Sequence, residues 1–330
     1  MDKQMTLSMI TDDLAFVDTP KKVFLERMDT LIPWKEFTDL IAPYYYDGKR
    51  GNKPYELELM IRLYLLQNLY NLSDMGTRNE VIDSRAFSSF CRVSSRNQIP
   101  DGDTLGRFRH ILEKNHLQEQ IFAAVLNKLR TEGKILKKGT IVDSTIIDAP
   151  SSTKNKENAR DPEAHSTKKG QNYRFGYKAH IGVDSESGIV HDLEVTAANA
   201  HDVTVAKDLL TGEEEEVYGD SGYLGIEKRE GAVRKNAKGQ KIRYKINKRP
   251  SQCRQGTNRS KGQGKRRERE KSKVRAKVEH VFGIIKGQFR YRKTRYRGAD
   301  ETEGENEYTI CFGKSGYSGQ KLFGGLISLR

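Results

Sequence analysis

Cysteine and long apolar runs are scarce in this 330-residue chain, and both shortages exclude classes of protein. The three cysteines, Cys91, Cys253 and Cys311, lie far apart and form no CxxC pair or Cys/His cluster. We therefore expect a reduced, cytoplasmic protein without disulfides or structural zinc. No segment approaches the ~18 apolar residues of a membrane span, and the first residues lack the apolar core of a signal peptide. We expect no membrane partner.

Positive charge is concentrated in one part of the chain. The whole sequence holds 59 Lys and Arg against 45 Asp and Glu, a net charge of +14. Residues 228–297 hold 27 Lys and Arg against 4 acids, a net +23, so the remainder carries −9. A mildly acidic protein with one strongly cationic segment indicates a polyanionic partner, and nucleic acid is the usual one.

The N-terminal part, residues 1–135, has a helical pattern. Leu57, Ile61, Tyr64 and Leu65 recur at helical spacing, and Ser73 precedes another short helix as a candidate cap. Short helices joined by tight turns are typical of a helix-turn-helix that binds DNA, and equally of a plain helical bundle. Both interpretations stay open for this domain.

From about residue 136 the pattern changes to that of strands. Residues 139–148 form a β-branched run, 177–184 alternate in polarity, and a turn at 185–188 leads into a second strand of a hairpin. A helix at 201–210, a short strand ending at Asp220, a strand near Ala232 and a long helix over about 265–289 follow; residues 150–170 and 250–264 read as loops.

This order predicts an α+β fold, in which an all-helical domain precedes a ribonuclease-H-like domain with a mixed sheet. The catalytic domain is expected at 136–298, with a basic insertion at about 236–270, and a divergent tail at 299–330.

Three acids stand out by their positions in these elements. Asp143 lies in the middle of the first strand, where a charge is costly unless something neutralises it. Asp220 ends a later strand, where α/β sheets place ligand sites, and Glu279 lies on the last helix. Three carboxylates without a Cys or His cluster suit Mg²⁺ or Mn²⁺, and two such ions are a common device for phosphodiester chemistry.

Other acids have structural interpretations. Asp148 is five residues from Asp143, so it points to the opposite face of the strand, and we expect it to cap the following loop. Asp184 sits at the hairpin turn, and Asp202 is a candidate N-cap. A lone strand acid would favour a structural role; three acids beside a +23 segment favour catalysis.

The last helix arranges charge on one stripe. Arg275, Glu279 and Lys286 fall within about 40° of one another at about 100° per residue. Such a stripe could bind a metal through the acid and a phosphodiester through the cations. The alternative is an ordinary surface ion pair, worth ~0.3–0.5 kcal/mol. An adjoining apolar face is expected to pack on the sheet; it comprises Val274, Val278, Val281, Ile285 and Phe289.

The chain resembles the bacterial insertion-sequence DDE transposases, in particular the insertion-sequence-five family. The resemblance rests on PDGDTLGRFRHILE (100–113), VDSTIIDAP (142–150), FGYKAHIGVD (175–184), TAANAHDVTVA (196–206), GDSGYLG (219–225) and AKVEHVFGIIKGQFRYRKTRYRG (276–298). It implies a transposase that cuts the ends of an insertion sequence and joins them to target DNA, as a homo-oligomer on DNA.

The resemblance also implies roles for individual residues. Asp143, Asp220 and Glu279 match the catalytic acids that hold two Mg²⁺ or Mn²⁺ ions. Candidate DNA contacts are Arg275, Lys286, Arg290, Arg292, Lys293 and Arg295. Candidates for residues that position the acids without binding the metal are Lys178, His201 and Asp202.

Two departures from the family pattern bear on function. Ser272 stands where the related group has a signature tyrosine, and residues 299–330 are polar and rich in glycine. The tail is either frameshifted or divergent, so the activity of this copy is open. The alternatives are a ribonuclease-H-like nuclease without strand transfer and a catalytically silent DNA-binding relic.

Overall fold

The structure, a computed structural model, describes residues 17–294 apart from 47, 49–50, 52, 155–158, 230 and 254–257. The described residues form two compact units, 17–117 and 118–294. The expected tail at 299–330 lies outside the described residues. The domain limits expected at 135 and 298 stay predictions, because compactness alone does not show where an independently folding domain ends.

The first unit is helical, as the sequence pattern predicted. Its helices are α2 (Pro20–Leu31), α3 (Trp34–Ile41), η1 (Ala42–Tyr44), α4 (Leu57–Leu69), α5 (Asp74–Asp83), α6 (Arg85–Phe90), η2 (Arg96–Gln98) and α7 (Gly102–Lys114). The Ser73 hydroxyl caps α5 by accepting from the Gly76 N–H, which confirms that expectation. Asp101 caps α7 in the same way.

Helix α4 is the central helix of this unit, since every residue from Leu59 to Leu69 is buried. Its one cation, Arg62, interrupts the apolar run but pairs with Asp29 and Glu58, each at 2.7 Å. The guanidinium also stacks over the Trp34 ring at 3.9 Å. A buried charge is tolerated here because its donors are satisfied.

The second unit contains a six-stranded mixed sheet. Its strands are β1 (Gly139–Asp148), β2 (His165–Lys169), β3 (Asn172–Asp184), β4 (Val190–Ala197), β5 (Glu216–Gly219) and β6 (Arg243–Ile246). The order is β2-β3-β1-β5-β6, with β4 pairing β3. β1 is antiparallel to β3 and parallel to β5, and β5 is parallel to β6. The predicted ribonuclease-H-like domain is confirmed.

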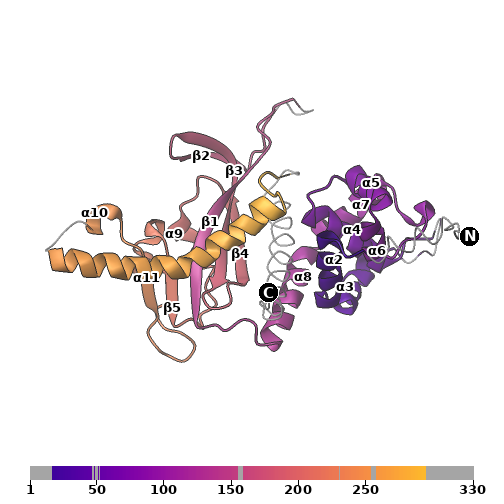
Figure 1. Ribbon diagram of the computed structural model, residues 1–330. Helices are drawn as coiled ribbons and strands as arrows, with labels where there is room; N and C mark the ends of the chain where they lie inside the picture. Colours follow the sequence, from indigo (N-terminus) through magenta and orange to yellow (C-terminus); the bar gives the residue numbers. More distant parts are fainter. Residues whose placement is uncertain are drawn as a thin grey trace, which may run out of the picture. The chain divides into compact units, whose positions relative to one another are not determined.

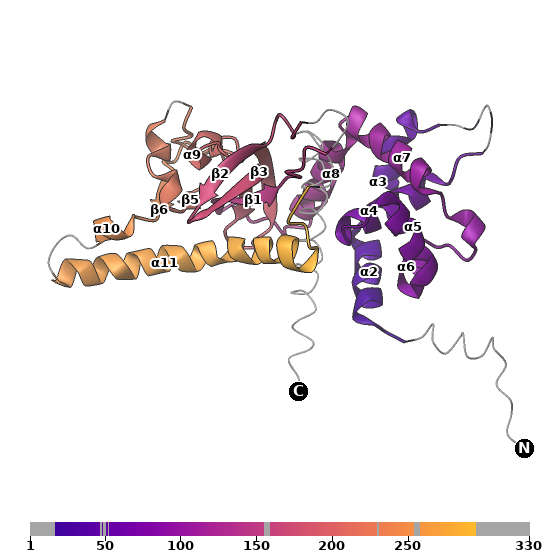
Figure 2. The same cartoon turned by 90° about the horizontal axis from the view of Figure 1, so that it is seen from above.

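Helices cover both faces of this sheet. The helices of this unit are α8 (Leu117–Thr131), α9 (Asp202–Val205), η3 (Ser221–Tyr223), η4 (Ile226–Lys228), α10 (Pro250–Cys253), α11 (Asn258–Gly283) and the π-helical η5 (Ile284–Gln288). Figures 1 and 2 show the sheet between the long α11 and the short α9.

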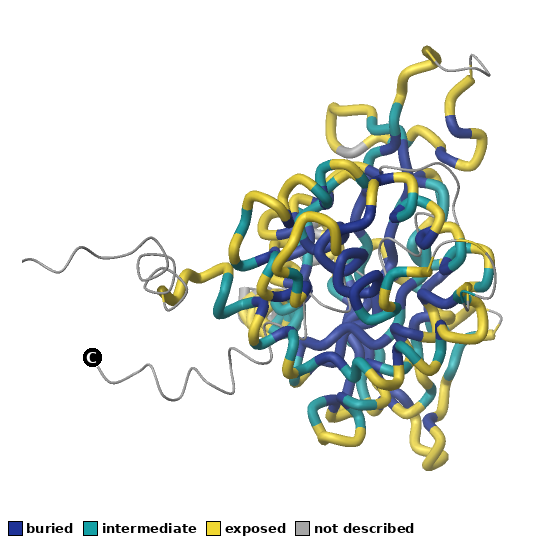
Figure 3. The backbone as a smooth tube through the Cα atoms, turned by 90° about the vertical axis from the view of Figure 1, so that its right-hand side faces the viewer, coloured by how far each residue is buried: buried dark blue, intermediate teal, exposed yellow. Residues whose placement is uncertain are grey.

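The two faces have separate apolar contacts. Four residues of the α11 and η5 face are buried as expected: Val278, Val281, Ile285 and Phe289. On the other side a core cluster includes Val142, Leu209, Val217 and Tyr223. Figure 3 colours the buried stretches of the backbone dark blue and the exposed ones yellow. Two-sided burial explains the continuous β-branched run of β1.

Several sequence-based boundaries were wrong. The expected loop at 150–170 contains β2, and the expected loop at 250–264 contains α10 and the start of α11. The helix expected at 201–210 is only the four-residue α9, followed by turns. The strand expected near Ala232 is absent from the described residues, where an isolated Lys235–Lys241 bridge and then β6 occur.

Gly176 gives a direct test of the β1–β3 pairing. A Cβ at this position would lie 2.1 Å from the Ile147 carbonyl oxygen and 2.7 Å from the Ala149 nitrogen. Both are backbone atoms of the paired strand, so they cannot move aside without breaking the ladder. We expect Gly176→Ala to destabilise the protein by about 2 kcal/mol or more, measured by urea denaturation.

Gly283→Ala is the matched control. A Cβ at Gly283 meets nothing within 4 Å, and the residue ends α11 with helical dihedrals. This substitution should raise stability by about 0.5–1 kcal/mol, because alanine loses less conformational entropy in a helix. Equal stabilities of the two variants would show that the strands are not paired in this register.

Candidate active site

The pairing of two parallel strands brings Asp143 and Asp220 together. In the β1–β5 ladder, Thr140 is opposite Val217 and Ile141 is opposite Tyr218. Asp143 and Asp220 each lie two residues beyond the last printed pair of this ladder, and Asp220 has extended dihedrals just after β5. Paired residues of adjacent strands point to the same face, so the two carboxyl groups are neighbours although 77 positions separate them in the sequence.

The environment of Asp143 disfavours its charged form. Burial raises the pKa of the Asp143 carboxyl to about 6, although the Ser144 N–H and Arg275 oppose the shift. The nearby charge of Asp220 adds to the increase in pKa. The Arg275 guanidinium is the counter-ion that the chain itself supplies, with Nη2 3.2 Å from Asp143 Oδ2.

A further acid, Asp202, joins the same neighbourhood from α9. Its carboxylate accepts from the Ser144 hydroxyl at 2.9 Å and lies 3.0 Å from Lys178 Nζ. The pKa of the buried Tyr223 phenol is raised, chiefly by burial and also by the charges of Asp143, Asp202 and Asp220. The charges of all three carboxylates therefore act on the Tyr223 phenol.

This placement corrects the expected N-cap role of Asp202. The N-cap residue of α9 is His201, and Asp202 is the first residue inside the helix. Lys178 lies opposite Ile146 of β1, and Asp202 binds Ser144 of the same strand; a supporting role for these residues stays a prediction. The His201 side chain is exposed and forms no hydrogen bond with the described residues.

Glu279 lies on α11 between two points at which this helical segment contacts β1. Arg275 reaches Asp143, and Lys286 donates from Nζ to the Ile146 carbonyl oxygen at 2.6 Å. Lys286 belongs to the π-helical η5, so the regular α-helical spacing assumed for the stripe ends at Ile284. π-helical turns often mark functional sites.

The third acid does not yet join the other two. Glu279 is exposed and forms no hydrogen bond or ion pair with the described residues. Within the described part of the chain, no group of three or more His, Cys, Asp or Glu side chains is placed to hold a metal ion. The role of Glu279 as a third metal ligand beside Asp143 and Asp220 therefore stays a prediction.

Residues of β6 and α11 that sequence reasoning missed hold the helix in place. Asn247, just after β6, donates to Glu268 at 2.9 Å and contacts Ser272 at 3.3 Å. Its side-chain oxygen accepts from Arg275 Nη1 at 3.4 Å. Lys271 donates to both the Ile246 carbonyl oxygen and Glu268, each at 2.8 Å. Ser272, at the signature tyrosine position, thus belongs to a network that ends at Asp143.

The cationic segment after η5 is anchored to the end of β1. The Asp148 N–H donates to the Arg292 carbonyl oxygen, and the Thr294 N–H donates to the Asp148 carbonyl oxygen. Tyr291 and Thr294 are buried, whereas the cations of this segment are exposed; they are Arg290, Arg292 and Lys293. Arg295 lies outside the described residues.

The sequence predicted that the Asp148 carboxylate caps the following loop, and this prediction was wrong. The carboxylate accepts two hydrogen bonds from Arg174 of β3, at 2.8 and 2.5 Å. This pairing with β3 uses the residue structurally. It leaves Asp143 as the acid of β1 that faces Asp220.

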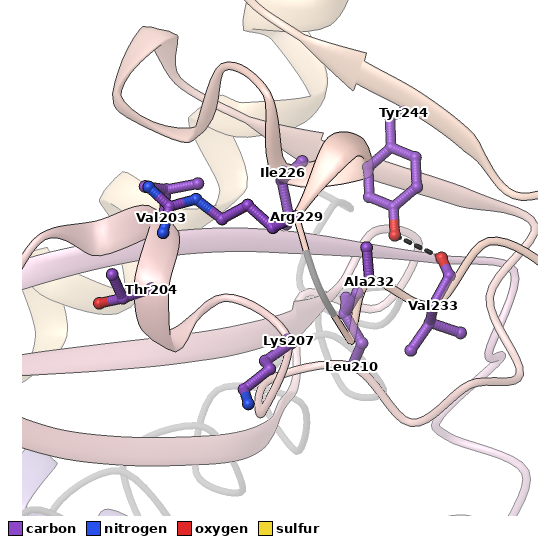
Figure 4. A pocket seen from close by; sticks show the side chains of 9 residues that line it. All are labelled: Val203, Thr204, Lys207, Leu210, Ile226, Arg229, Ala232, Val233 and Tyr244. Carbon is purple, nitrogen blue, oxygen red and sulfur yellow. Dashed lines mark hydrogen bonds between the residues drawn. The ribbon is translucent and has the colours of Figure 1, made fainter.

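A cavity of about 260 Å³ opens next to α9. Figure 4 shows its lining, which includes Thr204, Lys207, Ile226, Arg229 and Tyr244. The Tyr244 hydroxyl donates to the Val233 carbonyl oxygen, and burial raises its pKa to about 12. Neither Asp143 nor Asp220 lines this cavity, so we treat it as separate from the acid site.

The acid pair has the chemistry of a partly formed cation site. Asp143 and Asp220 supply hard oxygen ligands, and their mutual repulsion would be relieved by a divalent ion. Asp143 and Asp220 are two of the three acids expected as ligands, and this role stays a prediction. Arg275 neutralises part of the charge in the structure as it stands.

Comparison with known families identifies the family of this chain. The family described as Transposase DDE domain matches residues 135–311, more than half of the chain. The chain belongs to this family of DDE transposases. A second family, described as Transposase domain (DUF772), matches residues 15–111 in the helical unit. No solved structure gives a significant match.

Family membership fixes the class of the site. Members of the DDE transposase family act on DNA and generally depend on divalent metal ions. The narrower likeness to the insertion-sequence-five group stays an interpretation. Over the described residues, no helix is long and apolar enough to cross a membrane.

His180, whose Nδ1 lies 3.8 Å from the Asp202 carboxylate, should make the stability of the protein depend on pH. Burial lowers the pKa of its imidazole from 6.5 to about 4, although Asp202 partly opposes the shift. The folded state therefore binds fewer protons than the unfolded chain, so this contribution is complete above pH 6.5 and is lost as the pH falls towards 4. The loss should reach roughly 3 kcal/mol.

Two measurements check this expectation. NMR titration of the folded protein should show no protonation of His180 above pH 5, and His180→Gln should flatten the dependence of unfolding free energy on pH between 6.5 and 4. A His180 ring that titrates near 6.5 would contradict the buried, neutral assignment.

Proposed function

We propose that this chain is a transposase that cuts DNA at the ends of an insertion sequence and joins the freed 3′-hydroxyl to target DNA. The proposal assigns catalysis to Asp143, Asp220 and Glu279 as ligands of Mg²⁺ or Mn²⁺. The observation that supports it most is that the parallel β1–β5 pairing leads Asp143 and Asp220 to the same place, where the Asp220 charge acts on Asp143.

The position of Glu279 is compatible with a third ligand. It is one helical turn from Arg275, which touches Asp143, and its side chain is exposed and free to rotate. Binding of a cation between Asp143 and Asp220 would attract this carboxylate. Such a cation supplies electrostatic stabilisation of the charge on a transferred phosphoryl group and lowers the pKa of a bound water.

The chain's own residues would prepare this site. Burial and the Asp220 charge raise the pKa of the Asp143 carboxyl, and a bound cation would stabilise its charged form. Lys178 and Ser144 bind the Asp202 carboxylate near the acid pair. There its negative charge would add to those of Asp143 and Asp220. Arg275 neutralises Asp143 until a stronger counter-ion arrives.

Binding of DNA is assigned to the cations around this site. Arg275 and Lys286 flank Glu279 on the segment that contacts β1, and Arg290, Arg292 and Lys293 follow on the exposed side of the anchored segment. Arg295 would extend this run. Lysine and arginine side chains on phosphates provide affinity that does not depend on base sequence.

Glu279→Gln is the sharpest test of the proposed chemistry. The change keeps the shape of the side chain but removes a metal ligand and a charge that repels phosphate. We expect Mg²⁺-dependent cleavage of a DNA substrate carrying the element's ends to fall at least 1,000-fold, with DNA affinity unchanged or slightly higher. Cleavage and strand transfer are measured on the same labelled substrate.

Glu270→Gln on the same helix is the matched control. Glu270 is exposed and pairs with Arg266 at 3.2 Å, away from the acid site. Its variant should cleave like the wild type. Retained cleavage by the Glu279 variant would show that Glu279 belongs to the surface only, and cleavage without strand transfer by the wild type would indicate a nuclease.

A further inference from the structure

The N-terminal half of α11 has two faces of different character. Its inward face carries three charged residues. Glu268 accepts from Asn247, Lys271 donates to the Ile246 carbonyl oxygen at the end of β6, and Arg275 pairs with Asp143. Its outward face carries Lys265, Arg269 and Lys273, all exposed. These three cations fall within about 80° around the helix, and the centre of their stripe lies about 130° around the helix from that of the inward face.

The outward cations have no acidic partners among the described residues. The acids of this half-helix are both used elsewhere: Glu268 binds Asn247 and Lys271, and Glu270 pairs with Arg266. Lys265, Arg269 and Lys273 form no ion pair within the described part of the chain. Three like charges on one exposed stripe repel each other, so a polyanion would stabilise this surface.

The dimensions of the stripe match a DNA backbone. From Lys265 to Lys273 the helix rises about 12 Å, and the same length of duplex axis carries about seven phosphate charges. Figures 1 and 2 show this half of α11 extending beyond the strands, so that a duplex could approach it. Lys273 is two residues from Arg275, so the stripe begins next to the acid site and leads away from it.

We propose that Lys265, Arg269 and Lys273 form a second DNA-binding surface, which holds the phosphate backbone of the duplex flanking the reacting phosphate. The inward contacts of Glu268 with Asn247 and Lys271 hold the stripe in place relative to Asp143. The surface is sequence-independent, because it offers cations to phosphates and no bidentate set to base edges. This proposal rests on the proposed DNA transposase function.

The test compares DNA affinity across salt concentrations for the full-length protein. Replacing all three residues (Lys265→Gln, Arg269→Gln, Lys273→Gln) should reduce the slope of log K against log salt by up to ~2.7, because each lost phosphate contact removes about 0.9. Affinity at 0.15 M salt should fall roughly 100-fold. The loss should be equal for DNA with and without the element's ends.

Two control variants separate charge from position. Exchanging the cations (Lys265→Arg, Arg269→Lys, Lys273→Arg) keeps the charge and should keep the slope. Replacing Lys35, Lys134 and Lys137 by Gln lowers net charge equally, but these lysines already pair with Asp39, Glu132 and Glu213. That variant should bind DNA nearly as the wild type does.

The outcomes distinguish this proposal from the function on which it rests. An unchanged slope in the triple Gln variant, with tight DNA binding by the wild type, overturns the surface and leaves the transposase function standing. Loss of end preference in the charge-keeping variant overturns phosphate binding in favour of base reading. A wild-type protein that binds no DNA overturns the proposed function itself.

Discussion

The parallel pairing of β1 with β5 is the constraint on which the acid site depends. It pairs Ile141 with Tyr218, two residues before Asp143 and Asp220, and neither strand could slip by one residue without turning its side chains to the other face of the sheet. Both strands are held by burial on two sides, through Val142 and Val217 on one face and α11 on the other. The cost of placing two acids together is therefore met by the packing of the whole sheet.

Helix α11 connects this pair to the cationic part of the chain. Its inner face contributes apolar contacts through Val278 and Val281 and one ion pair through Arg275. The outer face carries mainly charged residues that are exposed to solvent. A segment with a net charge of +23 can therefore belong to a folded domain. Positive residues repel one another, and the helix relieves that repulsion by directing most of them into solvent.

Much of this arrangement could be predicted from the sequence. The central strand around Asp143, the hairpin, the end of β5 at Asp220 and the buried valine face of α11 all follow from local periodicity. The misses have a common cause. Asn247 and Glu268 lie in a run of polar residues without periodicity, and Asp202 looked like a helix cap because the start of α9 could not be placed to within one residue.

Most strands and helices, and the place where positive charge gathers, could be read from the sequence alone, because they depend on side-chain type and spacing over a few residues. Which acids are neighbours is a property of the folded chain. Asp148 pairs with Arg174, Asp202 approaches Ser144, and Asp143 meets Arg275 across 132 positions. Such contacts depend on strand register and helix docking, which are set by the packing of residues distant in the chain, and so no local pattern encodes them.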